Sequence, residues 1–257
     1  MDDADQVVVL ERGEHVLLIT LNRPDVRNAV NAAVANGIAA GLVELDEDPE
    51  LRVGILTGAP PGFCSGMDLK AYLAGESPWI PDRGFAGIAQ RGSHKPLIAA
   101  VEGFAMAGGF EIALACDLIV AARGTRFAIP EVKRGLFAGA GALIHLPRRI
   151  PHNIAVEMAL TGDPVLAERL YDFGLVNRLS EPGGALDAAR ELAAAIIANS
   201  PLAIRTTKEA LRRNRDLALD AAWEQQNELW ATIFASPDAR EGALAFAEKR
   251  APKWQTS

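Results

Sequence analysis

The order of hydrophobic patterns along the chain predicts an α/β core followed by an all-helical region. From residue 7 to residue 182, short β-rich runs alternate with segments of helical period. Two of the strand-like runs end in glycine-rich turns that lead directly into helices, at residues 62–69 and 103–109. Beyond residue 182 only helical period remains. We therefore expect a core over residues 1–182 and a helical piece over residues 183–257.

The first half of the core is expected to contain five strands and three helices. Residues 11–14 separate the first two strands and read as a hairpin turn. Asn28 or Asn31 is expected to cap the first helix, which ends near Asp46. Residues 75–84 are the least regular and predict a mobile loop near a ligand. The expected strands are 7–10, 15–21, 52–57, 97–101 and 118–122, and the expected helices end at residues 46, 74 and 116.

Helical period dominates the second half of the chain. Ser236 before Pro237 is a typical helix start. The last helices carry apolar side chains that a short appendage cannot bury, so we expect them to pack on the core or on another subunit. The expected helices are 153–160, 165–173, 185–199, 202–214, 217–235 and 237–249, with one strand-like run at 175–179.

Composition and charge narrow the classes of function. The 257 residues have a net charge of −7, and no basic cluster suggests nucleic-acid binding. Only two cysteines are present, which excludes a disulfide framework and a CxxC metal site. The N-terminal residues lack the pattern of a signal peptide, and no run is long and apolar enough to span a membrane. We expect a soluble cytoplasmic protein that binds neither nucleic acid nor membrane.

The glycine turn at residues 103–109 is a candidate anion site. A strand that ends at glycine and enters a helix leaves backbone N–H groups bare at the positive end of the helix dipole. Glu111 follows in the first helical turn among almost wholly apolar neighbours. A carboxylate there is costly unless it is paired, hydrogen-bonded or functional. In a simpler interpretation, Glu111 only interacts favourably with the positive end of the helix dipole, and Glu131 is a surface acid paired with Lys133 or Arg134.

Two other chemistries fit the residues less well. The spacing from Gly103 to Gly108 is that of a P-loop, but Gly109 and Phe110 replace its lysine and hydroxyl residue. Ser65 lies in G-x-x-S-G rather than the G-x-S-x-G of a nucleophile elbow. None of the four histidines is well placed in the sequence as its partner.

Several stretches in order along the whole chain resemble the crotonase (enoyl-CoA hydratase/isomerase) family. They are LNRPDVRNA, GAPPGFCSGMDL, KPLIAAVEGFAMAGGFEIALACDLIVAA, FAIPEVKRGL, LTGDPVLAERLYDFGLVN and REGALAFAEKRAPKW. The resemblance implies a spiral of ββα units with a helical C-terminal trimerisation region, and many members are hexamers built as dimers of trimers. The stretches PEVKRG and LPRRIP are also similar to the carnitinyl-CoA dehydratase branch.

The resemblance further implies a site for an acyl-CoA thioester. The thioester oxygen would lie between the N–H groups of Met67 and Gly108, and Glu111 and Glu131 would be the catalytic acids. No metal and no cofactor is expected beyond coenzyme A as part of the substrate. Trp230 and Lys249 match positions that reach the adenine end from a neighbouring subunit. The other substrate-contacting positions would be Arg27, Ala29, Ser65, Asp68, Leu69, Lys70 and Gly139.

The presence of both acids favours addition of water to a 2-enoyl-CoA, or the reverse. Glu111 would activate water for attack at C3, Glu131 would deliver a proton to C2, and the two N–H groups would stabilise the enolate. The alternatives are an enoyl-CoA isomerase, a carnitinyl-CoA dehydratase-like enzyme, and a non-catalytic acyl-CoA-binding homologue. Three departures from the family pattern bear on acyl specificity. They are Ala107 for glycine, Met67 for a smaller residue, and the loop 135–142, which lacks the usual proline and one glycine.

Overall fold

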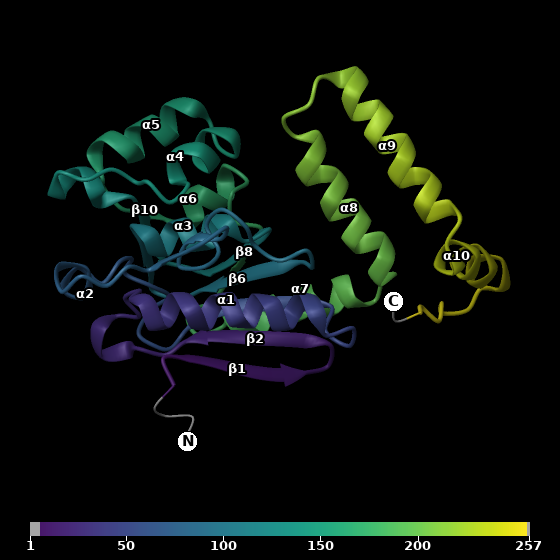
Figure 1. Cartoon of the computed structure of the whole chain (residues 1–257), viewed down its shortest axis with the longest axis horizontal. Helices are drawn as coiled ribbons and strands as arrows, with labels where there is room; N and C mark the ends of the chain where they lie inside the picture. Colours follow the sequence, from purple (N-terminus) through teal and green to yellow (C-terminus); the bar gives the residue numbers. More distant parts are fainter. Residues whose placement is uncertain (1–5, 256–257) are drawn as a thin grey trace.

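The computed structural model describes residues 6–255, and a six-stranded sheet forms the centre of the chain (Figure 1). The first two strands pair as an antiparallel hairpin, as predicted. All later neighbours in this sheet are parallel. The strand order is β1 (Val8–Gly13), β2 (Val16–Leu21), β3 (Val53–Gly58), β6 (Leu97–Val101), β8 (Leu118–Ala122) and β11 (Arg178–Ser180).

Alternate residues of the parallel strands face two separate hydrophobic clusters. On β3, Leu56 belongs to the larger cluster and Ile55 to the smaller one. The larger cluster also contains the apolar faces of α1 (Ala32–Glu47) and α3 (Gly108–Ala115). The smaller cluster lies beneath α7 (Ala185–Ile197). Since both faces are covered, the parallel strands consist almost wholly of buried apolar residues.

A second, three-stranded sheet joins the segments that carry the candidate site. It consists of β7 (Phe104–Met106), β9 (Arg126–Ala128) and β10 (Val165–Leu166). The strand β7 was not predicted from the sequence, because its three residues lie inside the glycine turn. The helix predicted from residue 165 was also wrong at its start. Residues 165–166 pair with β9, and α6 (Ala167–Asp172) begins only afterwards.

Short polar side chains fix where the N-terminal helices begin. Asn31 caps α1, and its side chain accepts from the N–H of Val34 at 3.1 Å. Asp68 caps α2 (Leu69–Leu73) in the same way. The segment predicted as a mobile loop contains a hairpin of β4 (Trp79–Ile80) and β5 (Gly84–Phe85). Its mobility stays a prediction.

The C-terminal helices extend away from the sheet. Figure 1 shows α8 (Pro201–Asn214) and α9 (Leu219–Phe234) as an antiparallel pair, with α10 (Pro237–Glu248) beyond them. Ser236 caps α10 as predicted. None of the residues of α9 is buried in the single chain. The remaining helices of the second half are α4 (Ala142–His145), the 3-10 turn η4 (Leu146–Arg148) and α5 (His152–Thr161).

Large apolar side chains remain on the surface of these last helices, so they do not pack on the core, and their predicted packing on another subunit stays a prediction. They include Leu219, Trp223, Trp230, Phe234, Leu244 and Phe246. Trp230 stacks on Phe234 with ring centroids 4.3 Å apart. Among residues 6–255, no helix is both long and apolar enough to cross a membrane. The boundary at residue 182 stays a prediction, and α7 itself packs on the sheet.

Candidate active site

The two glycine-rich turns meet at one place above the parallel strands. Gly66 has φ +97°, and a Cβ on it would lie 2.8 Å from the Cβ of Ala107 and 3.0 Å from the nitrogen of Gly108. Only glycine allows this approach. The peptide that follows Gly66 carries the N–H of Met67. The fold therefore places the two predicted donor groups, on Met67 and Gly108, next to each other.

Both donor groups are free to bind a ligand oxygen. Among residues 6–255, the N–H of Met67 and that of Gly108 have no hydrogen-bond acceptor. Gly108 is the first residue of α3, so no carbonyl of the helix lies within reach of its N–H. The N–H groups on either side of Met67 are occupied, since that of Asp68 binds Val30 and that of Gly66 binds Cys64. Two such N–H groups suit a developing oxyanion.

Ala107 connects the donor turn to both acids. Its φ is +52°, a conformation that favours glycine. Its N–H donates to the carbonyl of Ala128 at 2.9 Å, on the strand that leads to Glu131. Its carbonyl accepts from the N–H of Glu111 at 3.2 Å. These bonds hold the alanine in a conformation that is otherwise costly for a residue with a Cβ.

Glu111 is almost completely buried, with an exposed fraction of 3%. One carboxylate oxygen, Oε1, accepts from the N–H groups of Ala140 and Ala142, at 2.8 and 3.0 Å. Burial and, to a smaller extent, the charge of Glu131 together raise the pKa of Glu111 to about 7, against the opposing effect of the two N–H groups. The helix-dipole explanation accounts for neither the burial nor the neighbouring acid. A carboxyl group that titrates near neutral pH is suited to proton transfer.

Glu131 lies in the first turn of the 3-10 helix η3 (Pro130–Arg134) and is half-buried. Burial raises the pKa of Glu131 too, while Arg134 opposes that shift. Its Oε2 is buried and has no partner among the described residues. Lys133, which the alternative reading paired with Glu131, instead forms an ion pair with Asp163. An unsatisfied buried carboxylate oxygen beside a second acid leaves room for a water or a substrate proton as its partner.

The residues predicted to contact CoA from the N-terminal half surround the Met67 turn. The N–H of Ser65 donates to the carbonyl of Arg27 at 3.1 Å. Leu69 and Lys70 begin α2 and are exposed. Asp68 and Ala29 also have structural roles, because their oxygens accept hydrogen bonds from Arg23, at 3.0 and 2.6 Å. The contacts of all these residues with CoA stay predictions.

The remaining predicted contacts lie in two other places. Gly139 is exposed and directly precedes Ala140, which donates to Glu111. Trp230 lies on α9, and Lys249 ends α10 with φ +54°. Figure 1 shows both helices far from α2 and α3 in the single chain. The single chain therefore does not bring Trp230 and Lys249 to the site, and a contribution from a neighbouring subunit stays a prediction.

Sequence reasoning missed the residues that hold the site in place. Asn28, one of the two predicted caps of α1, is instead fully buried and donates to the carbonyls of Ala59 and Gly62, both at 2.8 Å. Ala140 and Ala142 act through their backbone N–H groups, so their residue type carries no signal. The glycines at 139 and 141 are the only hint that this loop approaches another group closely.

A family model described as enoyl-CoA hydratase/isomerase matches residues 11–257. The chain belongs to the enoyl-CoA hydratase/isomerase family. A carnitinyl-CoA dehydratase of Salmonella arizonae is 41% identical over 96% of this chain and 97% of its own length. An enoyl-CoA hydratase of Mycobacterium tuberculosis, EchA19, is 39% identical over 96% of both chains.

The solved structures agree on the fold. The crystal structure of an enoyl-CoA hydratase from Mycobacterium tuberculosis has a TM-score of 0.96 and 52% identity, and covers 98% of this chain and 100% of its own. One from Mycobacterium marinum has the same TM-score and 54% identity, with the same coverage. The predicted α/β crotonase fold with C-terminal helices is thereby confirmed. Its trimerisation stays a prediction.

Proposed function

We propose that this protein is an enoyl-CoA hydratase-type lyase that adds water reversibly across the C2=C3 bond of a 2-enoyl-CoA. The observation that supports this most directly is the pair of acids beside two free N–H donors. Glu111 is buried with a pKa of about 7, and Glu131 is close enough for its charge to raise that pKa. Relatives of similar length are named enoyl-CoA hydratase and carnitinyl-CoA dehydratase.

In the proposed reaction, the thioester oxygen accepts hydrogen bonds from Met67 and Gly108. Glu111 removes a proton from a water molecule, whose oxygen then forms a bond to C3. The electron pair of the double bond moves through C2 to the thioester oxygen, where the two N–H groups stabilise the enolate, each by a few kcal/mol. Glu131 donates a proton to C2 and yields the 3-hydroxyacyl-CoA. Dehydration follows the same path in reverse.

Two variants separate hydration from its alternatives. Glu131→Gln removes the proton donor and is expected to lower kcat by about 10²- to 10⁴-fold, measured as loss of the ultraviolet absorbance of the enoyl thioester. Unchanged turnover by this variant would contradict the mechanism. Glu111→Gln is expected to abolish hydration, whereas an isomerase should retain its activity without this second acid. A 3-enoyl-CoA substrate measures that alternative directly.

The carnitinyl-CoA dehydratase-like reaction is the second candidate, supported by the 41% identity over nearly the full length of such a relative. A panel of CoA thioesters that differ in chain length and in polarity at the acyl end would distinguish it. A preference for a cationic acyl group would favour this candidate. Saturable binding without any product would favour the non-catalytic reading.

We also propose the context in which the enzyme works. The reaction as written needs no metal and no cofactor, since coenzyme A enters as part of the substrate. Among residues 6–255 no group of three or more metal-ligating side chains is found. We infer a trimer or a dimer of trimers, cytoplasmic, in which the exposed apolar faces of α9 and α10 become buried. A role in fatty acid metabolism follows from the substrate class.

A further inference from the structure

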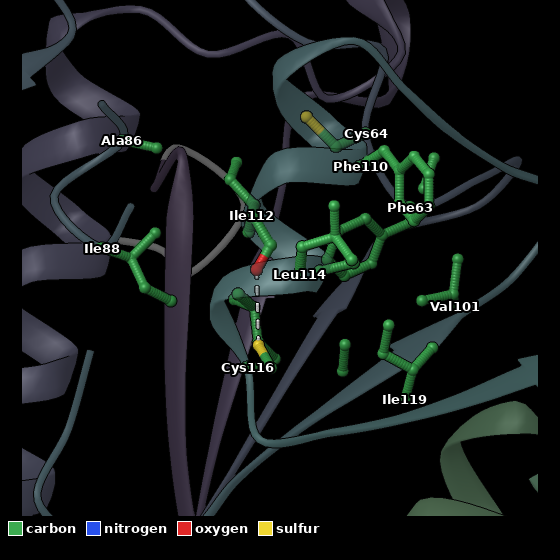
Figure 2. Packing of buried hydrophobic residues seen from close by; sticks show 14 of the residues in the cluster. Phe63, Cys64, Ala86, Ile88, Val101, Phe110, Ile112, Leu114, Cys116 and Ile119 are labelled. Atoms are coloured by element: carbon green, nitrogen blue, oxygen red, sulfur yellow. Dashed lines mark hydrogen bonds between the residues drawn. The ribbon is translucent and has the colours of Figure 1, made fainter. Parts of the chain in front are cut away.

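Cys64 lies where the two donor turns cross, and its main chain is packed against the Gly108 turn. It is fully buried, and its carbonyl oxygen accepts from the N–H of Met106 at 3.0 Å. A Cβ on Gly109 would lie 2.3 Å from that same oxygen. Since no real side chain fits at that distance, the start of α3 rests directly on the backbone of Cys64. Figure 2 shows Cys64 beside this end of the helix, next to Phe110.

The side chain of Cys64 reaches the other donor turn. Its sulfur accepts from the N–H of Gly66 at 3.3 Å and donates to the carbonyl of Asn28 at 3.1 Å. Burial raises the pKa of Cys64 to about 12, so the thiol keeps the proton that it donates. Asn28 is itself anchored by two hydrogen bonds of 2.8 Å. The sulfur is therefore a fixed acceptor rather than a mobile one.

Two hydrogen bonds then determine the conformation of Gly66, on which the direction of the Met67 N–H depends. The carbonyl of Gly66 accepts from Val30 at 2.8 Å, and its N–H donates to Cys64. With φ +97° and no Cβ, Gly66 has few steric limits of its own. Loss of the sulfur would leave a buried N–H unpaired and one side of this glycine unrestrained.

From this arrangement we infer that Cys64 is a positioning residue, which aligns the N–H of Met67 with that of Gly108 on the substrate carbonyl. The inference rests on the proposed function, since it assumes that these two N–H groups bind a thioester oxygen. The sulfur fixes the conformation of the turn that carries the N–H of Met67, and the backbone of the same residue packs against the turn that carries the N–H of Gly108. Misalignment of one donor weakens its bond to the developing oxyanion more than it weakens substrate binding.

The chain contains a matched control in Cys116. It is the other buried free cysteine, with an exposed fraction of 1%, and it caps the opposite end of α3. Within the part of the chain that the structure describes, its sulfur donates only to the carbonyl of Ile112, in its own helix, at 3.5 Å (Figure 2). Alanine at either position removes one sulfur from the same hydrophobic cluster. Only Cys64 contacts a donor turn.

The experiment compares C64A, C64S and C116A by hydration kinetics and by the carbonyl stretching frequency of a bound acyl-CoA thioester. C64A is expected to lower kcat by about 10- to 100-fold with KM within about 2-fold, because removal of a whole oxyanion donor costs 10²–10³. The carbonyl frequency should move toward that of the free thioester. C64S keeps a hydrogen-bond acceptor and donor at residue 64, so its kcat and its carbonyl frequency should be close to those of the parent. C116A should change neither quantity.

The inference is overturned if C64A keeps the parent kcat and frequency, or if C116A shows the same losses as C64A. Should C64A fail to fold, C64V fills the space without an acceptor and replaces it in the comparison. A saturated acyl-CoA also separates this inference from the proposed function. If the parent hydrates no enoyl-CoA but polarises this carbonyl, the function is wrong, and the shift caused by C64A still decides the role of Cys64.

Discussion

Glu111 is held in a place where its charged form is costly to the folded protein. Its pKa rises from 4.5 to about 7 on folding. Because the folded-state pKa lies above the unfolded value, the contribution of Glu111 to the free energy of unfolding is fully present below the unfolded pKa, where the group is protonated in both states. This contribution is lost as the pH rises through the folded pKa. The same burial that makes Glu111 a useful base thus lowers stability at neutral pH and above.

Glu111→Gln is therefore expected to stabilise the protein while it abolishes hydration. The glutamine oxygen can still accept from Ala140 and Ala142, but it carries no buried charge. At about pH 8 we expect the free energy of unfolding to increase by up to about 3 kcal/mol, as measured by urea denaturation. The gain should disappear below about pH 4.5, where Glu111 is protonated in both states. A variant less stable than the parent at all pH values would contradict the burial argument.

The same pKa predicts the pH dependence of the reaction. In the hydration direction Glu111 must be ionised, so kcat/KM should fall as the pH decreases through about 7. Dehydration starts from the same one-proton state of the two acids, with the proton on Glu111 instead of Glu131. Because the overall reaction takes up and releases no proton, its equilibrium constant does not change with pH, and kcat/KM for dehydration should fall over the same pH range. The measurement is a pair of pH–rate profiles, one for a 2-enoyl-CoA and one for its 3-hydroxyacyl-CoA product. A kcat/KM for hydration that stays constant as the pH decreases well below 7 would contradict the assignment of Glu111 as the base.

At the scale of elements, the loop between η3 and α4 determines where the Glu111 carboxylate lies. Gly141 has φ +119°, and a Cβ on it would lie 3.1 Å from the His145 ring. Gly141→Ala should therefore displace the N–H groups of Ala140 and Ala142. We expect a loss of about 1–3 kcal/mol in stability, together with a fall in kcat. Urea denaturation and steady-state kinetics measure the two effects.

Gly135 provides the control for this loop. It also has a positive φ, +68°, but a Cβ on it would meet no atom within 4 Å. Gly135→Ala should lower stability by about 1 kcal/mol from backbone strain and leave kcat close to that of the parent. If both variants lost activity equally, the strain alone would account for the effect, and the two hydrogen bonds to Glu111 would have no special role.

Regular elements with strong periodicity were predictable, and short elements were not. The hairpin β1–β2, the parallel strands and the helices α7 to α10 lie within a few residues of their expected positions. The strands β7 and β10 escaped prediction because each depends on pairing with β9 rather than on its own residues. In the site, Glu111 stood out as an acid in an apolar run. Cys64, Ala140 and Ala142 did not, because their contacts depend on tertiary structure and mostly on backbone groups.

For the whole molecule, the unpaired apolar faces of α9 and α10 predict self-association. Trp223 and Phe246 are 60% and 87% exposed in the single chain. The double variant Trp223→Ser/Phe246→Ser should therefore shift the protein from trimer to monomer, as light scattering coupled to size-exclusion chromatography would show. Leu73→Ser removes an equally exposed apolar residue from α2 and should leave the mass unchanged. A parent protein that is monomeric at micromolar concentration would refute the proposed assembly.

The alternation of side chains along β3 and β6 has a consequence for how such a protein can change over generations. On β3, Leu56 supports the side of the sheet that carries both acids, and its neighbour Ile55 supports α7. Neighbouring residues of one strand therefore support different parts of the molecule. Mutations of the residues that face α7 can alter how α7 and the helices after it are anchored, while the residues on the opposite face keep both acids in place. Acyl preference and assembly can thus diverge separately within one inherited sheet.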